Sequence, residues 1–407
     1  MKNISERRSN GVPLVKFTWA FFKIGLTAYG MAILQQIKTL IIGNKWLSRE
    51  EVDEGIAMVQ FYPGPIMYNL TTYCSYRLKG FNGGALATFF FILPSYLLIL
   101  LLSWLYFAYG NVAWVHPLFL ALEAMVIGVV LQVLLDFAKR YVQNGQQAII
   151  AGTAFILLLF KVNALFVILI AVLLEYIFRA VFKRNEPEEK MTAKDTGPVL
   201  PGKFKHRLTG IIITGVIFVG IFLIGLFSHN VLGKLLFSMF KVGAVAFGSG
   251  FTIMPLLQQE AVVSHHWLTM QQFADGIAFG QITPGPFLIT STFIGYKVAG
   301  FWGSVAATFG MFFPSFFYTL VVTEIYNKIK HYRLIRFFIT GIMSAFTGML
   351  MWVLLNLGKV SLTSPVLYIW AVGSFILVRC FKWNILWIFL AGIAAALLLY
   401  FARIPLV

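Results

Sequence analysis

Charged residues are scarce in this chain. Only 12% of its 407 residues are Asp, Glu, Lys or Arg, and 59% are hydrophobic. Because a soluble domain carries about a quarter charged residues, a water-soluble globule is excluded. The hydrophobic residues fall in runs long enough to cross a bilayer as helices, which takes about 20 mainly apolar residues. Alternation of apolar and polar residues at period two is absent, so a β-barrel is not expected.

Cysteine and the motifs of enzymes are also lacking. Cys74 and Cys380 are the only cysteines and lie in unlike contexts, which argues against a disulfide framework or a cysteine metal site. Glu260, His265 and His266 do not form a metal motif, because adjacent histidines do not share a helix face, and a solvated loop is predicted there. No HExxH, GxSxG or P-loop pattern occurs. We therefore expect no enzyme, no metal site and no cofactor.

The net charge of +17 comes from Lys and Arg residues that lie mostly in short loops between the apolar runs. Cytoplasmic loops of membrane proteins carry this excess. No long basic stripe interleaved with aromatic residues lies outside the runs, so nucleic-acid binding is not expected. The polar N-terminus lacks the features of a removed signal peptide. We expect a multi-pass protein in the lipid bilayer of the cytoplasmic membrane, with its N-terminus in the cytoplasm.

An internal duplication dominates the sequence. Residues 46–65 align with residues 267–286, with nine identities in 20 positions that include a Trp, a Gln and a Pro-Gly-Pro triplet. Residues 76–95 align with residues 296–315, again with nine identities in 20. Low-complexity apolar sequence would not align these residues in register. The chain therefore predicts two copies of one folding unit.

The two copies are expected at 1–182 and 208–407. The linker at 183–207 carries seven Lys or Arg residues as well as Pro and Gly, which predicts a solvated cytoplasmic segment. The fold class is all-α polytopic, with about 13 hydrophobic segments. These are 17–42, 56–78, 82–108, 117–138, 146–160, 163–182, 209–229, 233–257, 273–296, 300–324, 336–357, 365–379 and 383–402. Because the segment at 209–229 has no counterpart in the first copy, the copies should have inverted topology, as in many secondary transporters.

A Pro-Gly-Pro triplet lies inside an apolar helical segment of each copy. Proline removes a backbone donor and glycine adds freedom, so each helix should break there. Such a break exposes a helix N-terminus, which suits an anion. A packing kink is the alternative, but its repetition favours a binding role, and a broken crossing is favoured over a re-entrant hairpin. The predicted substrate-binding residues here are Gln60, Pro63, Gly64, Pro65, Asn69, Gln281, Thr283, Pro284, Gly285, Pro286 and Thr290.

Lys23 and Lys241 occupy matching positions inside apolar segments. An intramembrane cation is costly and is a candidate for function. Two ammonium groups facing one cavity would offset part of an anion's lost hydration, whereas snorkelling to the interface is the alternative. The neighbouring glycines serve either binding or close helix packing. The residues grouped with the lysines are Gly25, Tyr29, Gly30, Gly243, Phe247, Gly248, Ser249 and Gly250.

Three acidic residues are candidates for proton coupling. Glu54 and Asp275 occupy matching positions at the start of the Pro-Gly-Pro segments, where an acid also complements the helix dipole, so a structural role is favoured. Glu123 lies within an apolar span and aligns with Met343 of the second copy. Burial would disfavour its charged form, which suits a proton carrier, although pairing with a lysine is an alternative.

Taken together, these motifs resemble the chromate ion transporter family. In the first copy the lysine and glycine motif from Lys23 is followed by Trp46, Glu54 and the first Pro-Gly-Pro triplet. The second copy, in which residues 241–250 read KVGAVAFGSG, is the closer match. The first copy departs from the pattern at Tyr29, where the family has Phe, which leaves open whether both copies bind substrate equally. The resemblance covers nearly the whole chain.

This resemblance implies a secondary transporter that exports chromate from the cytoplasm, with sulfate and related oxyanions as further substrates or competitors. The two inverted units would alternate access to a site between the broken helices, driven by a proton or membrane-potential gradient. A carrier for sulfate or another anion is the first alternative, and an embedded enzyme or scaffold for a lipid headgroup is the second. The assembly state is left open, a homodimer included.

Overall fold

The computed structural model describes residues 13–29, 32–109, 115–182, 204–248, 250–329 and 333–402. These residues are almost entirely helical, and their only β-type pairing is a single bridge between Tyr29 and Gly285. Six of the described helices are long and apolar enough to cross a membrane. The all-α polytopic class expected from the sequence is therefore confirmed.

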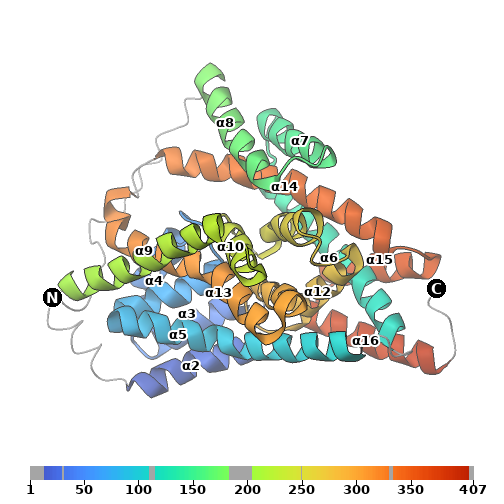
Figure 1. Ribbon diagram of the computed structural model, residues 1–407, viewed down its shortest axis with the longest axis horizontal. Helices are drawn as coiled ribbons and strands as arrows, with labels where there is room; N and C mark the ends of the chain where they lie inside the picture. Colours follow the sequence, from blue (N-terminus) through green and yellow to red (C-terminus); the bar gives the residue numbers. More distant parts are fainter. Residues whose placement is uncertain are drawn as a thin grey trace.

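The helices of the two copies follow one another in the same order. The first copy contains α2 (Leu14–Thr27), α3 (Ala32–Gly43), α4 (Arg49–Met58), α5 (Ile66–Tyr109), α6 (Val115–Tyr141), α7 (Gly145–Leu159) and α8 (Ala164–Phe182). The extra helix α9 (Phe204–Phe227) comes next. The second copy contains α10 (Val231–Ala244), η1 (Gly250–Ile253), α11 (Met254–Gln258), η2 (Gln259–Ser264), α12 (Met270–Ile282), η3 (Phe287–Ile289), α13 (Thr290–Ile329), α14 (Arg333–Ser361), α15 (Pro365–Arg379) and α16 (Ile385–Phe401). Figure 1 shows α5 running along the long axis of the molecule.

The long helix α5 consists of two antiparallel helices joined at Gly80. The backbone of Gly80 has a φ of 65° and a ψ of −156°, a conformation that glycine adopts without strain. Thr72 Oγ1 lies 2.9 Å from Thr88 Oγ1 across this turn. A straight helix would separate two residues 16 positions apart by about 24 Å. We call the two parts α5a (66–79) and α5b (81–109).

The equivalent helix α13 folds back in the same way at Gly300, where φ is 58°. Thr292 Oγ1 lies 2.7 Å from Thr308 Oγ1 across the turn. The two parts are α13a (290–299) and α13b (301–329). Both turns agree with the boundaries between expected segments, at 78 to 82 and at 296 to 300.

Each Pro-Gly-Pro segment forms the tip of a helical hairpin. At the base of the first hairpin, Arg77 Nη2 of α5a lies 2.7 Å from Glu51 Oε1 of α4. Nearer the tip, Gly55 of α4 packs against the ring of Tyr73 of α5a. Because the start of α4 lies beside the end of α5a, the two helices are antiparallel. The expectation of a broken crossing is therefore wrong, and the segment turns back as a re-entrant hairpin.

The segments that contain Lys23 and Lys241, which occupy matching positions in the two copies, are hairpins as well. Phe17 near the start of α2 contacts Trp46 just beyond the end of α3, with 5.1 Å between ring centroids. In the second copy, Lys241 of α10 reaches Glu260 of η2. Each copy thus loses two expected crossings, which leaves the parity of the count unchanged. Between equivalent elements lie the helices α5b, α6, α7, α8 and α9, which is an odd number, although α7 with its 15 residues is shorter than the helices long enough to cross a membrane.

The two copies are inverted with respect to each other. The equivalent helices α5 and α13 pack together across the interface between the copies. The ring centroids of Phe81 and Phe316 lie 6.0 Å apart near the start of α5b, and Tyr96 Oη lies 2.9 Å from Ser304 Oγ farther along. Residue numbers rise along α5b as they fall along α13b, so these two equivalent helices are antiparallel. Equivalent membrane helices with opposite directions confirm the expected inverted topology.

The fold at Gly80 predicts a disulfide that a straight α5 would not allow. In a background with Cys74→Ser and Cys380→Ser, the pair Thr72→Cys and Thr88→Cys should cross-link on mild oxidation, because the two hydroxyl oxygens lie 2.9 Å apart. Mass spectrometry of the digested protein would detect the linked peptides. The single-cysteine variants are the controls, and only unlinked peptides from the double variant would contradict the fold.

Candidate functional site

The tips of the hairpins meet in pairs between the two copies. Gly64 N of the first Pro-Gly-Pro turn donates to Ala246 O of the second copy at 2.5 Å. Gly285 N of the second Pro-Gly-Pro turn donates to Ala28 O of the first copy at 3.1 Å. We call these contacts the Gly64 tip and the Gly285 tip. Each one joins a Pro-Gly-Pro turn to the break that follows the lysine motif of the other copy.

Both Pro-Gly-Pro turns require their central glycine. The φ angles of Gly64 and Gly285 are 135° and 94°, in the region that side chains rarely adopt. A Cβ atom at Gly64 would lie 2.5 Å from Asn69 Nδ2 and 2.6 Å from Ser315 Oγ. At Gly285 it would overlap the hydroxyl of Ser95. The predicted helix breaks are confirmed, and backbone and polar side chains crowd together at each.

The two tips differ in how their polar groups are satisfied. At the Gly285 tip, Ser95 Oγ donates to Pro284 O at 2.6 Å. At the Gly64 tip, the equivalent hydroxyl of Ser315 and both amide atoms of Asn69 have no hydrogen-bond partner among the described residues. Asn69 is fully buried. Buried polar atoms are normally paired with protein or water, so this cluster indicates a place for a ligand or for bound water.

The other predicted polar residues around the tips behave differently from one another. Gln281 is buried, and its Nε2 has no partner among the described residues. Gln60 is exposed and donates to Ile56 O at 3.1 Å. Thr283 and Thr290 donate to backbone carbonyls of their own segments, at 2.8 Å and 2.9 Å. Only Gln281 therefore resembles Asn69 in offering a buried amide.

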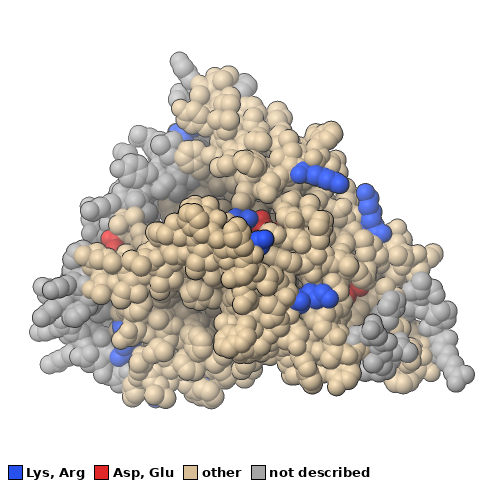
Figure 2. Space-filling view, in the orientation of Figure 1, with Lys and Arg blue, Asp and Glu red and all other residues tan. Residues whose placement is uncertain are grey.

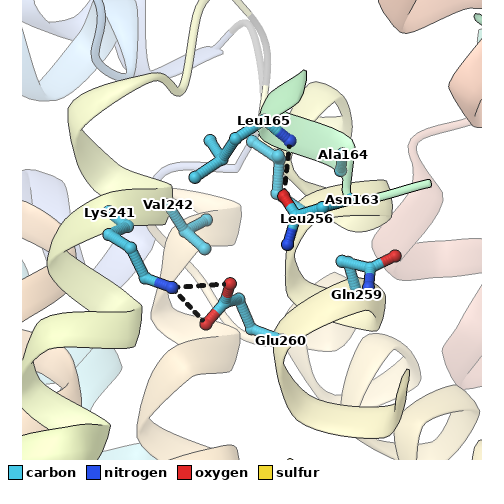
Figure 3. A pocket seen from close by; sticks show the side chains of 8 residues that line it. All are labelled: Asn163, Ala164, Leu165, Lys241, Val242, Leu256, Gln259 and Glu260. Atoms are coloured by element: carbon cyan, nitrogen blue, oxygen red, sulfur yellow. Dashed lines mark hydrogen bonds and ion pairs between the residues drawn. The ribbon is translucent and has the colours of Figure 1, made fainter. Parts of the chain in front are cut away.

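Lys241 is held by an acidic residue that the sequence did not associate with it. Its Nζ lies 2.9 Å from both carboxylate oxygens of Glu260, and Ser238 Oγ donates to Glu260 Oε2 at 2.6 Å. Figure 3 shows this bidentate contact. The predicted solvated loop around Glu260 is wrong, because η2 extends the helix of α11 and turns the carboxylate towards α10. Only 4% of the Glu260 surface is exposed.

A small hollow opens beside this ion pair. Figure 2 shows Lys or Arg side chains next to Asp or Glu near the middle of one face, where α10 lies. The residues that line the hollow are Asn163, Ala164, Leu165, Lys241, Val242, Leu256, Gln259 and Glu260. Nearby, burial lowers the pKa of His265, the positive charges of Lys241 and Lys234 lower it too, and Glu260 opposes them. His265 is therefore largely neutral at pH 7, so Lys241 supplies the positive charge.

Lys23 does not share this environment. It lies on an exposed stripe of α2 with Val15, Trp19 and Leu26, and its Nζ is 5.9 Å from the Trp19 ring centroid. Apolar residues on such a stripe face lipid, and a lysine among them can snorkel to the interface. The expectation that Lys23 and Lys241 face one cavity is therefore wrong.

The glycines that follow the two lysines allow close helix packing. A Cβ atom at Gly25 would overlap the carbonyl oxygen of Phe91 in α5b, and one at Gly243 would overlap that of Met311 in α13b. Gly250 packs against the Phe287 side chain. The aromatic residues of the motif flank the tips: Tyr29 forms the bridge with Gly285, and Phe247 and Gly248 follow Ala246. The candidates Gly30 and Ser249 lie outside the described residues.

Two of the three coupling candidates come together. Glu123 of α6 and Asp275 of α12 lie within hydrogen-bonding reach of each other, although they belong to different copies. Tyr106 Oη donates to Asp275 Oδ2 at 2.5 Å, and Gln271 Nε2 donates to Glu123 Oε1. The exposed fractions of Glu123 and Asp275 are 1% and 2%. The sequence proposed each acid separately, but nothing in it indicated that they form a pair.

Glu54 lies apart from this carboxyl pair. It is half-buried in α4 and lies close enough to Tyr73 and Tyr326 to act on them electrostatically. Tyr326 is the equivalent of Tyr106 in the second copy, so Glu54 and Asp275 have similar aromatic neighbours. Glu123 lies beside Asp275, and Met343 holds the position of Glu123 in the second copy.

Comparison with known proteins identifies relatives over most of the chain. A family model described as "Chromate transporter" matches residues 15–176 and 233–397. A probable chromate transport protein of Synechococcus elongatus is 31% identical over 86% of this chain and 86% of its own length. A chromate transport protein of Cupriavidus metallidurans is 28% identical over 84% and 82%. An uncharacterized transporter of Methanocaldococcus jannaschii is 27% identical over 97% and 96%. No solved structure matches.

The close packing of the lysine-motif glycines can be tested by substitution. We expect Gly25→Ala and Gly243→Ala each to lower the melting temperature in detergent, because the added methyl group meets a backbone oxygen that cannot move freely. Overpacking of this kind costs about 1–3 kcal/mol. Gly358→Ala is the matched control, since a Cβ atom there has nothing within 4 Å. Equal stability of all three variants would show that these glycines do not serve packing.

Proposed function

The chain belongs to the chromate transporter family, and on this premise we propose that it is a secondary transporter exporting chromate or a related oxyanion from the cytoplasm. The observation that carries the proposal is the Gly64 tip. There, unwound backbone of both copies meets the fully buried Asn69 and the hydroxyl of Ser315, whose polar atoms lack partners among the described residues. Irregular backbone at membrane depth is tolerated where it lines a site or packs on protein.

The proposed orientation follows from the basic loops. Arg77 and Lys79 end α5a, Lys139 and Arg140 end α6, and Arg379 ends α15. With re-entrant hairpins these positions all fall on one side of the membrane. The positive-inside rule makes that side the cytoplasm. The same count puts the N-terminus and the linker there, in a cytoplasmic membrane.

The proposed transport cycle is alternating access between the inverted copies. The Gly64 tip and the Gly285 tip are equivalent by the repeat, and each joins a hairpin of one copy to a hairpin of the other. Rocking of one copy against the other would open one side of the tips and close the opposite side. The tips differ in their free polar groups, so a single substrate site at the Gly64 tip fits better than two equal sites.

The proposed substrate is a tetrahedral oxyanion with two negative charges. Helix N-termini and amide donors at the tips suit an anion, and Lys241 lies about one turn before the Gly64 tip on α10. Chromate is favoured because two relatives carry it in their names. Sulfate has the same charge and shape, so it is the first competitor to consider.

The proposed energy source is a proton gradient acting through Glu123 and Asp275. Two buried carboxyl groups in contact do not both ionise, so the pair should hold one proton. Loss of that proton would leave two like charges between α6 and α12. Because α12 leads into the Gly285 tip, their repulsion would move a hairpin that contacts the other copy.

Transport of chromate is tested in cells. Expression of the chain in a chromate-sensitive host should lower the accumulated chromate relative to the empty vector, because export opposes uptake. Purified protein in liposomes, offered a panel of oxyanions under imposed pH gradients, would then identify the substrate and the driving ion. Unchanged accumulation at verified membrane abundance would remove chromate as the substrate.

Proton coupling is tested by Glu123→Gln. The amide keeps the shape and the contact with Gln271 but cannot carry a proton, so uptake driven by a pH gradient should fall at least about tenfold. Exchange of labelled for unlabelled anion should persist, since it needs no net proton movement. Asp136→Asn is the control, because Asp136 lies on the same helix and pairs with Arg379 at 3.2 Å on the surface. Unchanged response of Glu123→Gln to the gradient would contradict the coupling role.

A further inference from the structure

We infer that Glu260 is a displaceable counter-anion of Lys241, whose place the transported oxyanion takes on its way through the Gly64 tip. The inference rests on the proposed function, which it deepens by naming the group that competes with the substrate. In the empty protein the carboxylate of Glu260 neutralises the ammonium of Lys241. In the loaded protein the oxyanion does so, and Glu260 moves aside.

The first argument is the geometry of the contact. The Glu260 carboxylate accepts both contacts from Lys241 at 2.9 Å and one from Ser238 at 2.6 Å. An oxyanion could accept from the same Lys241 ammonium, because a tetrahedral anion makes charge-assisted contacts of this kind. The exposed fraction of the Lys241 side chain is 28%, against 5% for Glu260. The ammonium is therefore partly exposed, but the hollow beside it is too narrow to hold an anion in this conformation, so its lining residues must move apart when the oxyanion binds.

The second argument is the polarity of the hollow. Besides Lys241 it is lined by Asn163 and the first residues of α8. Asn163 Oδ1 accepts from Leu165 N at 2.9 Å, so its amide nitrogen is turned towards the hollow, as Figure 3 shows. The N-terminal end of the 19-residue helix α8 adds partial positive charge. Among the described residues that line the hollow, Glu260 alone is acidic.

The third argument is that the hairpin fold does not need this ion pair. The equivalent hairpin of the first copy forms without it: Lys23 faces outwards, and residues 35–45, which hold the place of η2, contain no Asp or Glu. That hairpin closes on the Phe17 and Trp46 rings instead. Both copies have the lysine, but the second copy alone has the acid that pairs with it. Glu260 is therefore not needed for the shared fold, which points to a role in transport.

Displacement leaves Glu260 with other partners. Ser238 remains within 2.6 Å and His265 Nε2 within 3.6 Å of the same carboxylate oxygen. The charged and titratable groups that face Glu260 are therefore Lys241 of α10 and His265 after η2, with Lys234 of α10 acting on His265. A carboxylate that can shift between these donors costs less to displace than one with a single partner.

The test compares neutral variants in binding and transport. For Glu260→Gln we expect tighter binding of chromate and of sulfate, by about tenfold, since the amide no longer competes for Lys241. Binding is measured as the anion-induced rise in melting temperature of the purified full-length protein. Lys241→Gln should weaken binding by a similar factor. The double variant Lys241→Gln with Glu260→Gln should bind as weakly as Lys241→Gln alone.

A structural ion pair gives a different pattern. It predicts that Glu260→Gln weakens binding or leaves it unchanged, and that the double variant recovers wild-type transport in liposomes. Either result would overturn the inference. Glu324→Gln is the matched control, because Glu324 is a part-buried acid paired with Arg207 at 3.2 Å away from the hollow, and anion affinity should not change.

Two further measurements keep the outcomes separable. Glu260→Asp retains a shorter carboxylate, so its affinity should lie between those of the wild type and Glu260→Gln; an affinity outside that range would count against competition. If the wild type transports no oxyanion of the panel, the proposed function fails and the inference with it. If the wild type transports and Glu260→Gln does not gain affinity, only the inference fails.

Discussion

The need to satisfy backbone groups at membrane depth is the constraint on which the rest of this structure depends. Each Pro-Gly-Pro turn interrupts a helix where no bulk water is available to pair the freed amides. The two copies meet this need for each other: Gly64 N donates a hydrogen bond to Ala246 O, and Gly285 N donates one to Ala28 O. The same two bonds that make the breaks tolerable therefore also tie the inverted copies together at their hairpin tips.

Close approach of helices follows from this arrangement. The tips can meet only if α2 lies against α5b and α10 against α13b, and a glycine faces a backbone carbonyl in each pair, Gly25 and Gly243 respectively. In a bilayer, association relies on such packing because lipid offers no hydrophobic driving force. The motif that combines a lysine with glycines is thus mainly a packing motif in the first copy and acquires an ion pair in the second.

The departures from symmetry concentrate polar chemistry at a few places. Within the described parts of the chain, Asn69 and Ser315 have no hydrogen-bond partner at the Gly64 tip, whereas Ser95 donates to Pro284 O at the Gly285 tip. Glu123 joins Asp275, and Glu260 joins Lys241, with no equivalent in the other copy. A duplicated scaffold supplies two equivalent frames, and single substitutions in one frame place buried polar groups there without changing the shared fold.

The sequence alone determined the membrane class, the duplication, the helix breaks and the turns near Gly80 and Gly300, because apolar length, register and glycine or proline placement act locally. It also singled out Lys241, Asn69, Glu123 and Asp275. Only the tertiary structure decided that the broken segments are re-entrant hairpins and that each hairpin tip contacts a tip of the other copy. It also decided that Lys241 pairs with Glu260 and that Asp275 lies beside Glu123. These depend on contacts between the copies or across a hairpin, where the direction of each helix decides which side chains face each other, and no local pattern encodes that direction.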